Sequence, residues 1–582
     1  MNRKQRRAAI KQRPLASGRT ATSASDPIEP LFAQAAHLQR QNKLDDAARA
    51  YKRVLVLKPN HAEACNNLGV VLLAQGKLSE ASTQFARALS LMPNLFDQFH
   101  GVCMTLVAVA PPIGEAMKKA AAAWPTRPSL EQLLGDGGLG AIAAEPMLLC
   151  LLQSTPARDV ALERLLTAVR MALLAGLDEK LANAATIAFV SAMARQCFIN
   201  EYVFATTPDE DARVERLKVS IGDALAAGAS VPPLWTASLA MYQPLHALPN
   251  AEALLDRTWP AAVDDVLNQQ LREPRQEREL RQTIPRLTPI EDDVSQRVRK
   301  QYEENPYPRW VDITCDFEPV AIDWVLRQMF PAAAFAPLGK TEDIEVLVAG
   351  SGTGRHAIWL AQRFAGVRLL AVDLSLSSLC FAKRKTPAAI AERITYAQGD
   401  ILKLGTLDRN FDVVDASGVL HHMADPLEGW RILLSLLRPG GFMHVALYSD
   451  IARRDVVATR TFISERGYAS TAEDIRRCRQ DLLDMPLRAI SRFNDFFSMS
   501  ECRDLLFNVQ EGRMTIPQIK AFIAEHALKF IGFVFERSVM HSFKMQFAQN
   551  GWSLSDLDRW HEMETNNPDL FSGMYQLWLQ KS

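Results

Sequence analysis

The sequence contains few cysteines, no long apolar run and no excess of either charge. Its eight cysteines lie far apart without a C-x-x-C pair. This argues against a disulfide framework and a zinc site, and predicts a reducing, cytoplasmic location without a bound metal. No run of eighteen or more apolar residues is present, so no membrane span is expected. The 66 basic residues equal the 66 acidic ones, so bulk charge gives no sign of a nucleic-acid ligand.

Basic residues are concentrated at the N-terminus, where no acid precedes Asp26. This segment lacks the apolar core of a secretory signal. We therefore expect residues 1–27 to form a disordered, solvated basic arm. Two alternatives stay open: binding of RNA or lipid through residues 1–20, and a role as an organellar transit peptide.

Residues 28–130 carry a pattern that repeats every 34 residues. Leucine, small, aromatic and proline positions recur at this spacing: Leu38, Leu72 and Leu106; Ala47 and Ala81; Tyr51 and Phe85; Pro59 and Pro93. Two copies are clear and the third is degenerate, with Pro111-Pro112 in its expected inter-helix turn. The pattern resembles the tetratricopeptide repeat, in which small residues let paired helices cross closely. The resemblance implies a concave groove for a protein partner or peptide. Docking within the chain, or self-association, is the alternative.

Residues 131–287 show no motif that indicates chemistry. Apolar residues recur at steps of three and four along this region, which predicts a helical middle domain. The charged, proline-bearing stretch 272–293 is typical of a linker or an exposed helix that leads to the last part of the chain.

Chemistry is first indicated by the segment VLVAGSGTG, residues 346–354. An apolar run breaks into alternating glycines at Gly350, Gly352 and Gly354, which predicts a strand, a tight turn and a helix start. Asp373 ends the next apolar run, where a carboxylate can bind the two hydroxyls of a ribose. The pattern therefore predicts an adenosine-containing cofactor. The G-x-G-x-x-G spacing of dinucleotide enzymes is absent, because residue 355 is arginine.

Three further motifs follow in order. Asp400 comes after a short predicted strand, a fourth strand ends before His421-His422, and residues 437–448 combine a Pro-Gly-Gly turn with a fifth strand. Over about residues 342–450, this order and spacing resemble the class I S-adenosylmethionine-dependent methyltransferases.

The resemblance implies specific roles for these residues. Gly350, Gly352 and Gly354 would border the methionine part of S-adenosylmethionine, Asp373 would hold its ribose, and Asp400 would meet its adenine. One departure is Val348, which stands where many relatives carry an acid. One contact to the amino end of the cofactor is then expected from elsewhere.

The resemblance also implies the fold. We expect an α/β Rossmann-like domain with a seven-stranded sheet over residues 288–582, preceded by the all-α repeats and the helical middle domain. Residues 529–536 and 574–580 fit its two closing strands, of which the last is antiparallel. The chain between them and the fifth strand suggests an insertion at about 451–527.

Three groups of residues are candidates for contact with the methyl acceptor. Residues 301–310, QYEENPYPRW, precede the first strand, where relatives often carry a lid, and Tyr307 and Arg309 are expected to reach the pocket. His421 and His422 are candidate general bases near neutral pH. In the insertion, Phe496, Phe497 and Arg503 are candidates for acceptor choice. Bracing of an interdomain turn, helix capping and lid packing are the alternative roles for these three groups of residues.

These observations predict a methyltransferase that uses S-adenosylmethionine and acts on an unidentified acceptor, either a protein or a small molecule. The motif of DNA-adenine methylases is absent after the fourth strand, where residues 415–418 read DASG. The repeats would recruit a protein partner or the substrate. One alternative is a scaffold protein that binds the cofactor without turnover. The other is an RNA methyltransferase steered by the basic arm.

Overall fold

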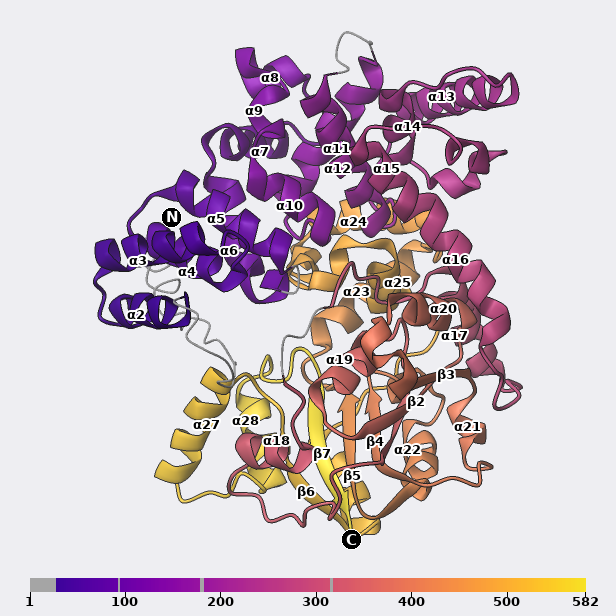
Figure 1. Cartoon of the computed structure of the whole chain (residues 1–582). Coiled ribbons are helices and arrows are strands. Elements are labelled where there is room, and N and C mark those ends of the chain that lie inside the picture. The colour runs from indigo at the N-terminus through magenta and orange to yellow at the C-terminus, as the bar shows by residue number, and fades with distance from the viewer. Residues whose placement is uncertain (1–27, 93–94, 178–182, 314–317) are drawn as a thin grey trace. The chain divides into compact units, whose positions relative to one another are not determined.

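The computed structural model describes residues 28–92, 95–177, 183–313 and 318–582. The predicted basic arm, residues 1–27, lies outside this described part. The chain divides into two compact units (Figure 1). The first unit consists of Met1–Pro274, Trp310–Thr314 and Phe496–Met499, and the second of Arg275–Arg309, Cys315–Asp495 and Ser500–Ser582.

The first unit starts with consecutive pairs of helices. These are α2 (Ile28–Arg40) with α3 (Leu44–Leu57), α4 (Ala62–Ala74) with α5 (Leu78–Leu91), and α6 (Leu95–Val109) with α7 (Pro111–Ala123). Ala47 and Ala81 are fully buried. A Cβ added at Gly69 would lie 3.0 Å from the Phe85 ring, so α4 and α5 cross closely at a residue without a side chain. The expectation of a turn at Pro111 is wrong: this proline begins α7, where its missing N–H costs no hydrogen bond.

The rest of the first unit is helical, as its apolar periodicity predicts. Its helices are α8 (Leu130–Leu134), α9 (Gly140–Ala143), α10 (Pro146–Ser154), α11 (Val160–Ala175), α12 (Ala184–Ile199), α13 (Pro208–Ala226), α14 (Pro233–Ala240), α15 (Ala261–Leu267) and the start of α16 (Glu273–Leu280). Side chains of Asp159, Asn183 and Thr207 cap the starts of α11, α12 and α13 by accepting backbone N–H groups. Among the described residues, no helix combines the length and apolar character needed to cross a bilayer.

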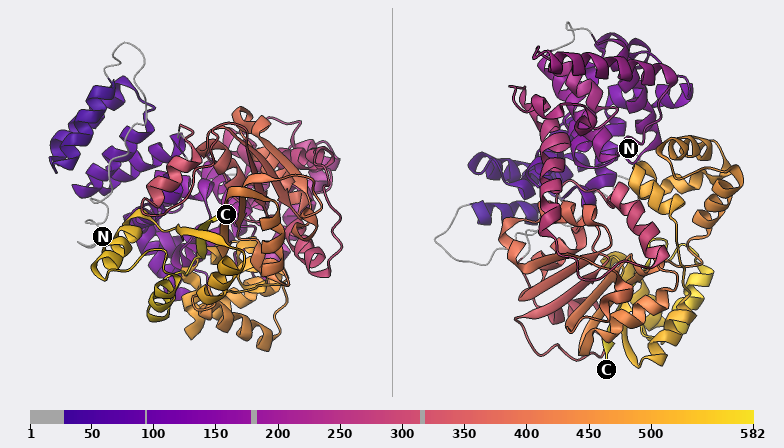
Figure 2. Two further views of the ribbon diagram at one scale, coloured as in Figure 1. Left: turned by 90° about the horizontal axis from the view of Figure 1, so that it is seen from below. Right: turned by 90° about the vertical axis from the view of Figure 1, so that its right-hand side faces the viewer.

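The second unit is built on a seven-stranded sheet with the order β3-β2-β1-β4-β5-β7-β6. The strands are β1 (Ile344–Ala349), β2 (Val367–Asp373), β3 (Ile394–Gln398), β4 (Phe411–Ser417), β5 (Leu437–Leu447), β6 (Leu528–Phe533) and β7 (Tyr575–Lys581). Pairing is parallel from β3 to β5, whereas β7 lies antiparallel between β5 and β6. The right-hand view of Figure 2 shows strands of this sheet side by side. The predicted Rossmann-like sheet with an antiparallel last strand is confirmed.

The second unit also contains helices, some of which flank this sheet. They are α17 (Asp293–Glu304), α18 (Ile322–Met329), α19 (Arg355–Arg363), α20 (Leu376–Lys385), α21 (Ile401–Leu404), α22 (Pro426–Ser435), α23 (Arg454–Arg466), α24 (Ala472–Leu483), most of α25 (Met499–Phe507), α26 (Ile516–Glu525), α27 (Arg537–Gln549) and α28 (Leu557–Asn566). Leu347, Val414 and Met443 point to one face and share a core with Trp430 of α22 and Phe522 of α26. Alternate residues of the same strands point to the other face.

The Pro-Gly-Gly segment differs from its expected form. It lies inside β5, because that strand already starts at Leu437. The pairing with β4 slips here: Phe411 faces Leu437, but Val413 faces Phe442. Gly440 has a φ of 76°. A regular strand does not contain this left-handed angle, whereas a β-bulge can. The predicted turn is therefore a bulge within the strand.

Candidate active site

The candidate active site begins at the turn between β1 and α19. Gly350, Gly352 and Gly354 have left-handed backbone angles, with φ of 73°, 51° and 78°. A Cβ at Gly350 would lie 2.3 Å from Val419 Cγ2, and one at Gly352 would lie 2.8 Å from the Tyr307 carbonyl oxygen. Glycine is therefore required at this turn by the backbone angles and by the neighbouring atoms alike.

Asp373, at the end of β2, holds this turn. Its Oδ2 accepts a hydrogen bond from the Gly352 N–H, and its Oδ1 accepts one from the Ser375 N–H, both at 2.8 Å. Burial raises the pKa of Asp373 above its usual value, and the nearby Glu303 carboxylate raises it further. Each carboxylate oxygen keeps a second lone pair. The partly exposed Asp373 can therefore accept hydrogen bonds from a vicinal diol while it fixes the glycine turn.

Asp400 follows β3 and caps α21. Its Oδ1 accepts a hydrogen bond from the Leu402 N–H at 3.0 Å. Its Oδ2 is buried without a partner at hydrogen-bond distance among the described residues, although the Ser295 side chain lies close enough to lower the pKa of the carboxyl, and the whole residue is only 2% exposed. A buried acceptor without a donor costs about 1–3 kcal/mol. A ligand that brings an N–H group to Oδ2 would remove this cost, so Asp400 fits the amino group of an adenine.

The predicted lid segment lies against the glycine turn. The Thr353 hydroxyl donates a hydrogen bond to the Pro308 carbonyl at 2.5 Å. The Glu303 carboxylate accepts hydrogen bonds from the Leu376 N–H and the Ser377 hydroxyl, each at 2.5 Å, at the start of α20. Residues 303–308 are thus fastened to both the β1–α19 turn and the β2–α20 turn.

A buried polar network lies beyond the end of β4. His422 Nε2 is 3.1 Å from the Tyr302 hydroxyl, and His422 Nδ1 is 3.2 Å from the Gln510 carbonyl. The Tyr302 hydroxyl donates a hydrogen bond to Asp504 Oδ1 at 2.5 Å. Asn508 Nδ2 donates to the same oxygen at 2.7 Å. The network joins the lid, the β4–α22 connection and α25, so His422 is held in place on both ring nitrogens.

His421 is the less constrained of the two histidines. Its ring centre lies 4.0 Å from that of Tyr448 and 4.1 Å from that of His422. Its Nδ1 is buried and has no hydrogen-bond partner among the described residues. Burial lowers the pKa of His421 well below its usual value, and the charges of His422 and Arg453 lower it further. His421 is therefore a neutral imidazole at pH 7, with a nitrogen available to a ligand.

Tyr302, His421, His422 and Tyr448 form a cluster of rings, here called the aromatic wall, and Arg453 packs against its Tyr448 ring. The Arg453 guanidinium lies 3.8 Å from the centre of the Tyr448 ring and pairs with the Glu511 carboxylate at 2.5 Å. The side chains of Arg453 and Glu511 are each only 3% exposed. Burial and the charge of Asp504 raise the pKa of Tyr448, so its hydroxyl stays protonated.

The residues predicted for the acceptor side have different contacts in the structure. The Tyr307 ring centre lies 6.2 Å from that of Tyr302, so Tyr307 joins the wall. Arg309 is partly buried at the end of the same segment, and its role stays a prediction. Arg503 instead braces the lid, because its guanidinium donates hydrogen bonds to Asn305 Oδ1 at 2.6 Å and to the Ser470 carbonyl at 2.7 Å.

Two aromatic residues are candidates for acceptor choice. Phe496 and Phe497 are 0% and 4% exposed and are grouped with the first compact unit, and their role stays a prediction. Sequence reasoning placed Glu303 in the candidate lid without a specific role, and it missed Asp504 and Tyr448. Tyr448 could have been found, because it directly follows the fifth apolar run. Asp504 gives no local signal, since DLLF has the pattern of an ordinary amphipathic helix.

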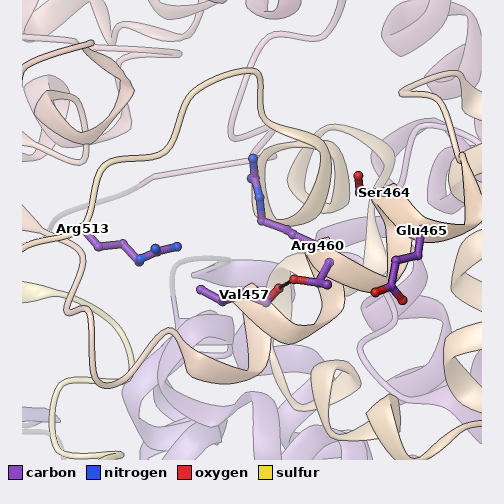
Figure 3. A pocket seen from close by; sticks show the side chains of 6 residues that line it. Val457, Arg460, Ser464, Glu465 and Arg513 are labelled. Carbon is purple, nitrogen blue, oxygen red and sulfur yellow. Dashed lines mark hydrogen bonds between the residues drawn. The ribbon is translucent and has the colours of Figure 1, made fainter.

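A separate pocket opens at α23, in the predicted insertion. It is lined by Val457, Arg460, Thr461, Ser464, Glu465 and Arg513 (Figure 3). Arg460 donates a hydrogen bond to the Asn508 carbonyl at 2.7 Å, so one wall of the pocket backs onto the polar network. None of the residues predicted for the cofactor or the acceptor lines this pocket.

Comparison with known protein families identifies two parts of the chain. Residues 347–445 match the methyltransferase domain, and residues 32–94 match the tetratricopeptide repeat. An uncharacterized protein of Synechococcus sp. is 31% identical over 169 residues, which cover 28% of this chain and 40% of that protein. Methyltransferase GfsG of Streptomyces halstedii is 27% identical over 175 residues, which cover 29% of this chain and 59% of that protein. The chain thus spans 40% to 59% of the length of these relatives.

One similar solved structure is PKMT2 from Rickettsia typhi in complex with AdoHcy. It is 16% identical to this chain with a TM-score of 0.36, and the match covers 46% of this chain and 55% of that one. The two family matches confirm the predicted resemblance. The second unit holds a methyltransferase domain of the S-adenosylmethionine-dependent class, and the first unit carries tetratricopeptide repeats.

Proposed function

We propose that this chain transfers a methyl group from S-adenosylmethionine to an acceptor that binds beside Tyr302 and His421. One observation carries the proposal. The strand ends of β1, β2 and β3 bring together a turn of left-handed glycines, the Asp373 carboxylate and the unpartnered Asp400 Oδ2. In open parallel sheets, ligands bind at this edge.

Each group of site residues is proposed to bind a different part of the cofactor. We assign the ribose hydroxyls to Asp373, the adenine amino group to Asp400 Oδ2, and the methionine part to the glycine turn. The cofactor supplies an electrophilic methyl group on a sulfonium. The chain has to bind this group, exclude water and align the acceptor in line with it, and alignment is a large part of catalysis in such displacements.

His421 is the proposed proton acceptor. When the acceptor attacks the methyl carbon, the carbon–sulfur bond breaks and the acceptor loses a proton. His421 is neutral before this step, so it can take the proton at Nδ1, which has no other partner among the described residues. Its lowered pKa makes it a weaker base than a free imidazole, so its contribution comes from its position. His422 is proposed as a positioning residue, because Tyr302 and the Gln510 carbonyl hold its ring.

The tetratricopeptide repeats are proposed to recruit a protein partner or the substrate itself, and the cysteine pattern supports a cytoplasmic location. Hydrogen–deuterium exchange on the full chain tests recruitment once an acceptor is known. Protection within residues 28–91 on addition of the acceptor supports it. Protection confined to residues 288–582 contradicts it.

Label transfer tests the activity. The full chain is incubated with methyl-labelled S-adenosylmethionine and fractions of a bacterial extract. We expect a labelled acceptor with the wild type and none with Gly352→Val, since the added side chain collides with the Tyr307 carbonyl. Gly405→Ala is the matched control, because a Cβ there meets only Ile432 at 3.6 Å. Cofactor binding without any labelled acceptor would favour the scaffold alternative.

A further inference from the structure

Two histidines and an aspartate lie close together on one face of the sheet. It is the face opposite the one on which Trp430 packs against Val414 and Met443. Asp415 of β4 and His444 of β5 are register partners in the parallel ladder, and His356 reaches them from α19, elements that Figure 1 labels. His356 Nε2 and His444 Nδ1 each lie 2.8 Å from the same oxygen, Asp415 Oδ2. The three ligand-capable atoms all lie within 4.8 Å of one another.

From this geometry we propose that His356, Asp415 and His444 form a binding site for a divalent transition-metal ion of the zinc type. Two imidazoles and one carboxylate are a donor set that such ions prefer, and they leave further positions for water. Zinc bonds to nitrogen and oxygen are about 2.0–2.2 Å long, so tetrahedral ligand atoms lie about 3.4 Å apart. Opening the two 2.8 Å contacts by roughly half an ångström would admit the ion.

The burial and hydrogen bonds of these residues support a metal site. The Asp415 residue is only 1% exposed and His444 only 6%, and burying such groups is costly unless they are paired or bind a metal. The Ser417 N–H donates to Asp415 Oδ1 at 3.2 Å, which orients the carboxylate. A hydrogen bond of this kind to a ligating carboxylate is usual around metal sites. The Ser417 hydroxyl lies 3.1 Å from His444 Nδ1 and would have to turn away when that nitrogen binds the ion.

Aromatic rings fix both imidazoles, and one side stays open. Trp578 stacks on His444 with ring centres 4.9 Å apart, and Trp359 stacks on His356 at 5.8 Å. The His356 side chain is 36% exposed, so an ion and its water ligands can reach the site from solvent. The absence of a zinc site was expected from the cysteines alone. This set needs no cysteine, and its members are 59 and 29 residues apart in the chain.

The ion would have a structural role. Asp415 also pairs in register with Val348, two residues before the glycine turn, and His356 is the second residue of α19. A metal held by His356, Asp415 and His444 would cross-link β4, β5 and the start of α19, directly behind the turn. This inference does not depend on methyl transfer, because none of the three ligands is among the residues proposed to contact the cofactor or the acceptor.

Metal titration of the full, tag-free chain tests the proposal. The protein is stripped with a chelator and titrated calorimetrically with zinc chloride, and cobalt(II) is used to record ligand-field absorption bands. We expect one zinc per chain and cobalt bands in the wild type and in His541→Ala, which removes an exposed histidine. In Asp415→Asn and His356→Ala, which each remove a ligand, we expect zinc affinity to fall at least on the order of 100-fold, since loss of an outer-shell partner alone costs roughly 10–100-fold.

The outcomes are decisive. Wild-type binding no stronger than that of His356→Ala would overturn the proposal and leave a hydrogen-bonded His–Asp–His cluster. Zinc binding that all variants share would assign it to other groups and would also overturn it. If Asp415→Asn does not fold, His356→Ala decides, since its ring is partly exposed. Titration with S-adenosylmethionine in parallel separates this result from the proposed function.

Discussion

Replacement of Gly350 by alanine should damage the site in a measurable way. Gly350 has a φ of 73°, and the left-handed region costs a residue with a Cβ about 1–2 kcal/mol. The new Cβ would also lie 2.3 Å from Val419 Cγ2 and 2.4 Å from Val419 Cβ. Overpacking of this kind costs about 1–3 kcal/mol. We therefore expect a total cost of about 2–5 kcal/mol.

This cost can appear in two measurements. If the strained turn persists in the free protein, the free energy of unfolding falls by this amount. If the free turn relaxes instead, the cofactor must restore it, and 2 kcal/mol corresponds to about a 30-fold loss of affinity. Denaturant unfolding and calorimetric titration with S-adenosylmethionine together capture the whole effect. Gly405→Ala is the control, because Gly405 has helical angles and an ordinary contact at 3.6 Å.

A second substitution separates the two causes. Val419→Gly in the Gly350→Ala background removes the colliding side chain but leaves the backbone strain. Val419→Gly has a cost of its own, so it serves as the reference: in that background, adding Gly350→Ala should cost only the strain, about 1–2 kcal/mol. The reasoning is refuted if Gly350→Ala changes neither stability nor affinity, or if it costs as much in the Val419→Gly background as in the wild type.

Three further predictions follow from the site. His421→Gln should lower kcat about 10²–10⁴-fold in the label-transfer assay and leave the Kd of S-adenosylmethionine unchanged; an unaltered kcat would remove His421 from the mechanism. Arg453→Met leaves the buried Glu511 carboxylate only its longer, 3.9 Å ion pair with Arg460, so the free energy of unfolding should fall by about 3 kcal/mol in urea titrations. The free-protein pKa of Asp373 is raised, and ribose hydroxyls favour its ionised form. Affinity for S-adenosylmethionine should therefore be full above this pKa and fall as pH drops through it. The same decline in Asp373→Asn would assign it to another group.

Local order in the sequence was enough to predict where the proposed cofactor residues lie in the fold. Gly350, Asp373 and Asp400 each follow directly on an apolar run that forms a strand, so their position at one sheet edge follows from parallel topology. The strand ends differ from those expected by a few residues, because hydrogen-bond pairing rather than composition sets them. The bulge at Gly440 depends on how β4 and β5 pair, which no single run of residues encodes.

The polar clusters could not be predicted in this way. Tyr302 and Asp504 share a hydrogen bond across 202 positions of sequence, and His356 and Asp415 across 59. Such contacts depend on how elements pack, and the residues around each partner look like ordinary helix or strand. Arg503 is a further example. Its charge suggested a role in acceptor choice, and in the fold its guanidinium donates a hydrogen bond to Asn305.

Calorimetric titration of the purified full chain with S-adenosylmethionine tests the central claim most directly, with NAD as the comparison ligand. We expect binding of S-adenosylmethionine and none of NAD. Asp373→Ala should weaken the binding about 100-fold, since hydrogen bonds to a charged group contribute about 1.5–3 kcal/mol each. Asp408→Ala, which removes an exposed carboxylate before β4, should leave it unchanged. Absence of binding by the folded wild type, or equal affinity in Asp373→Ala, would contradict the account.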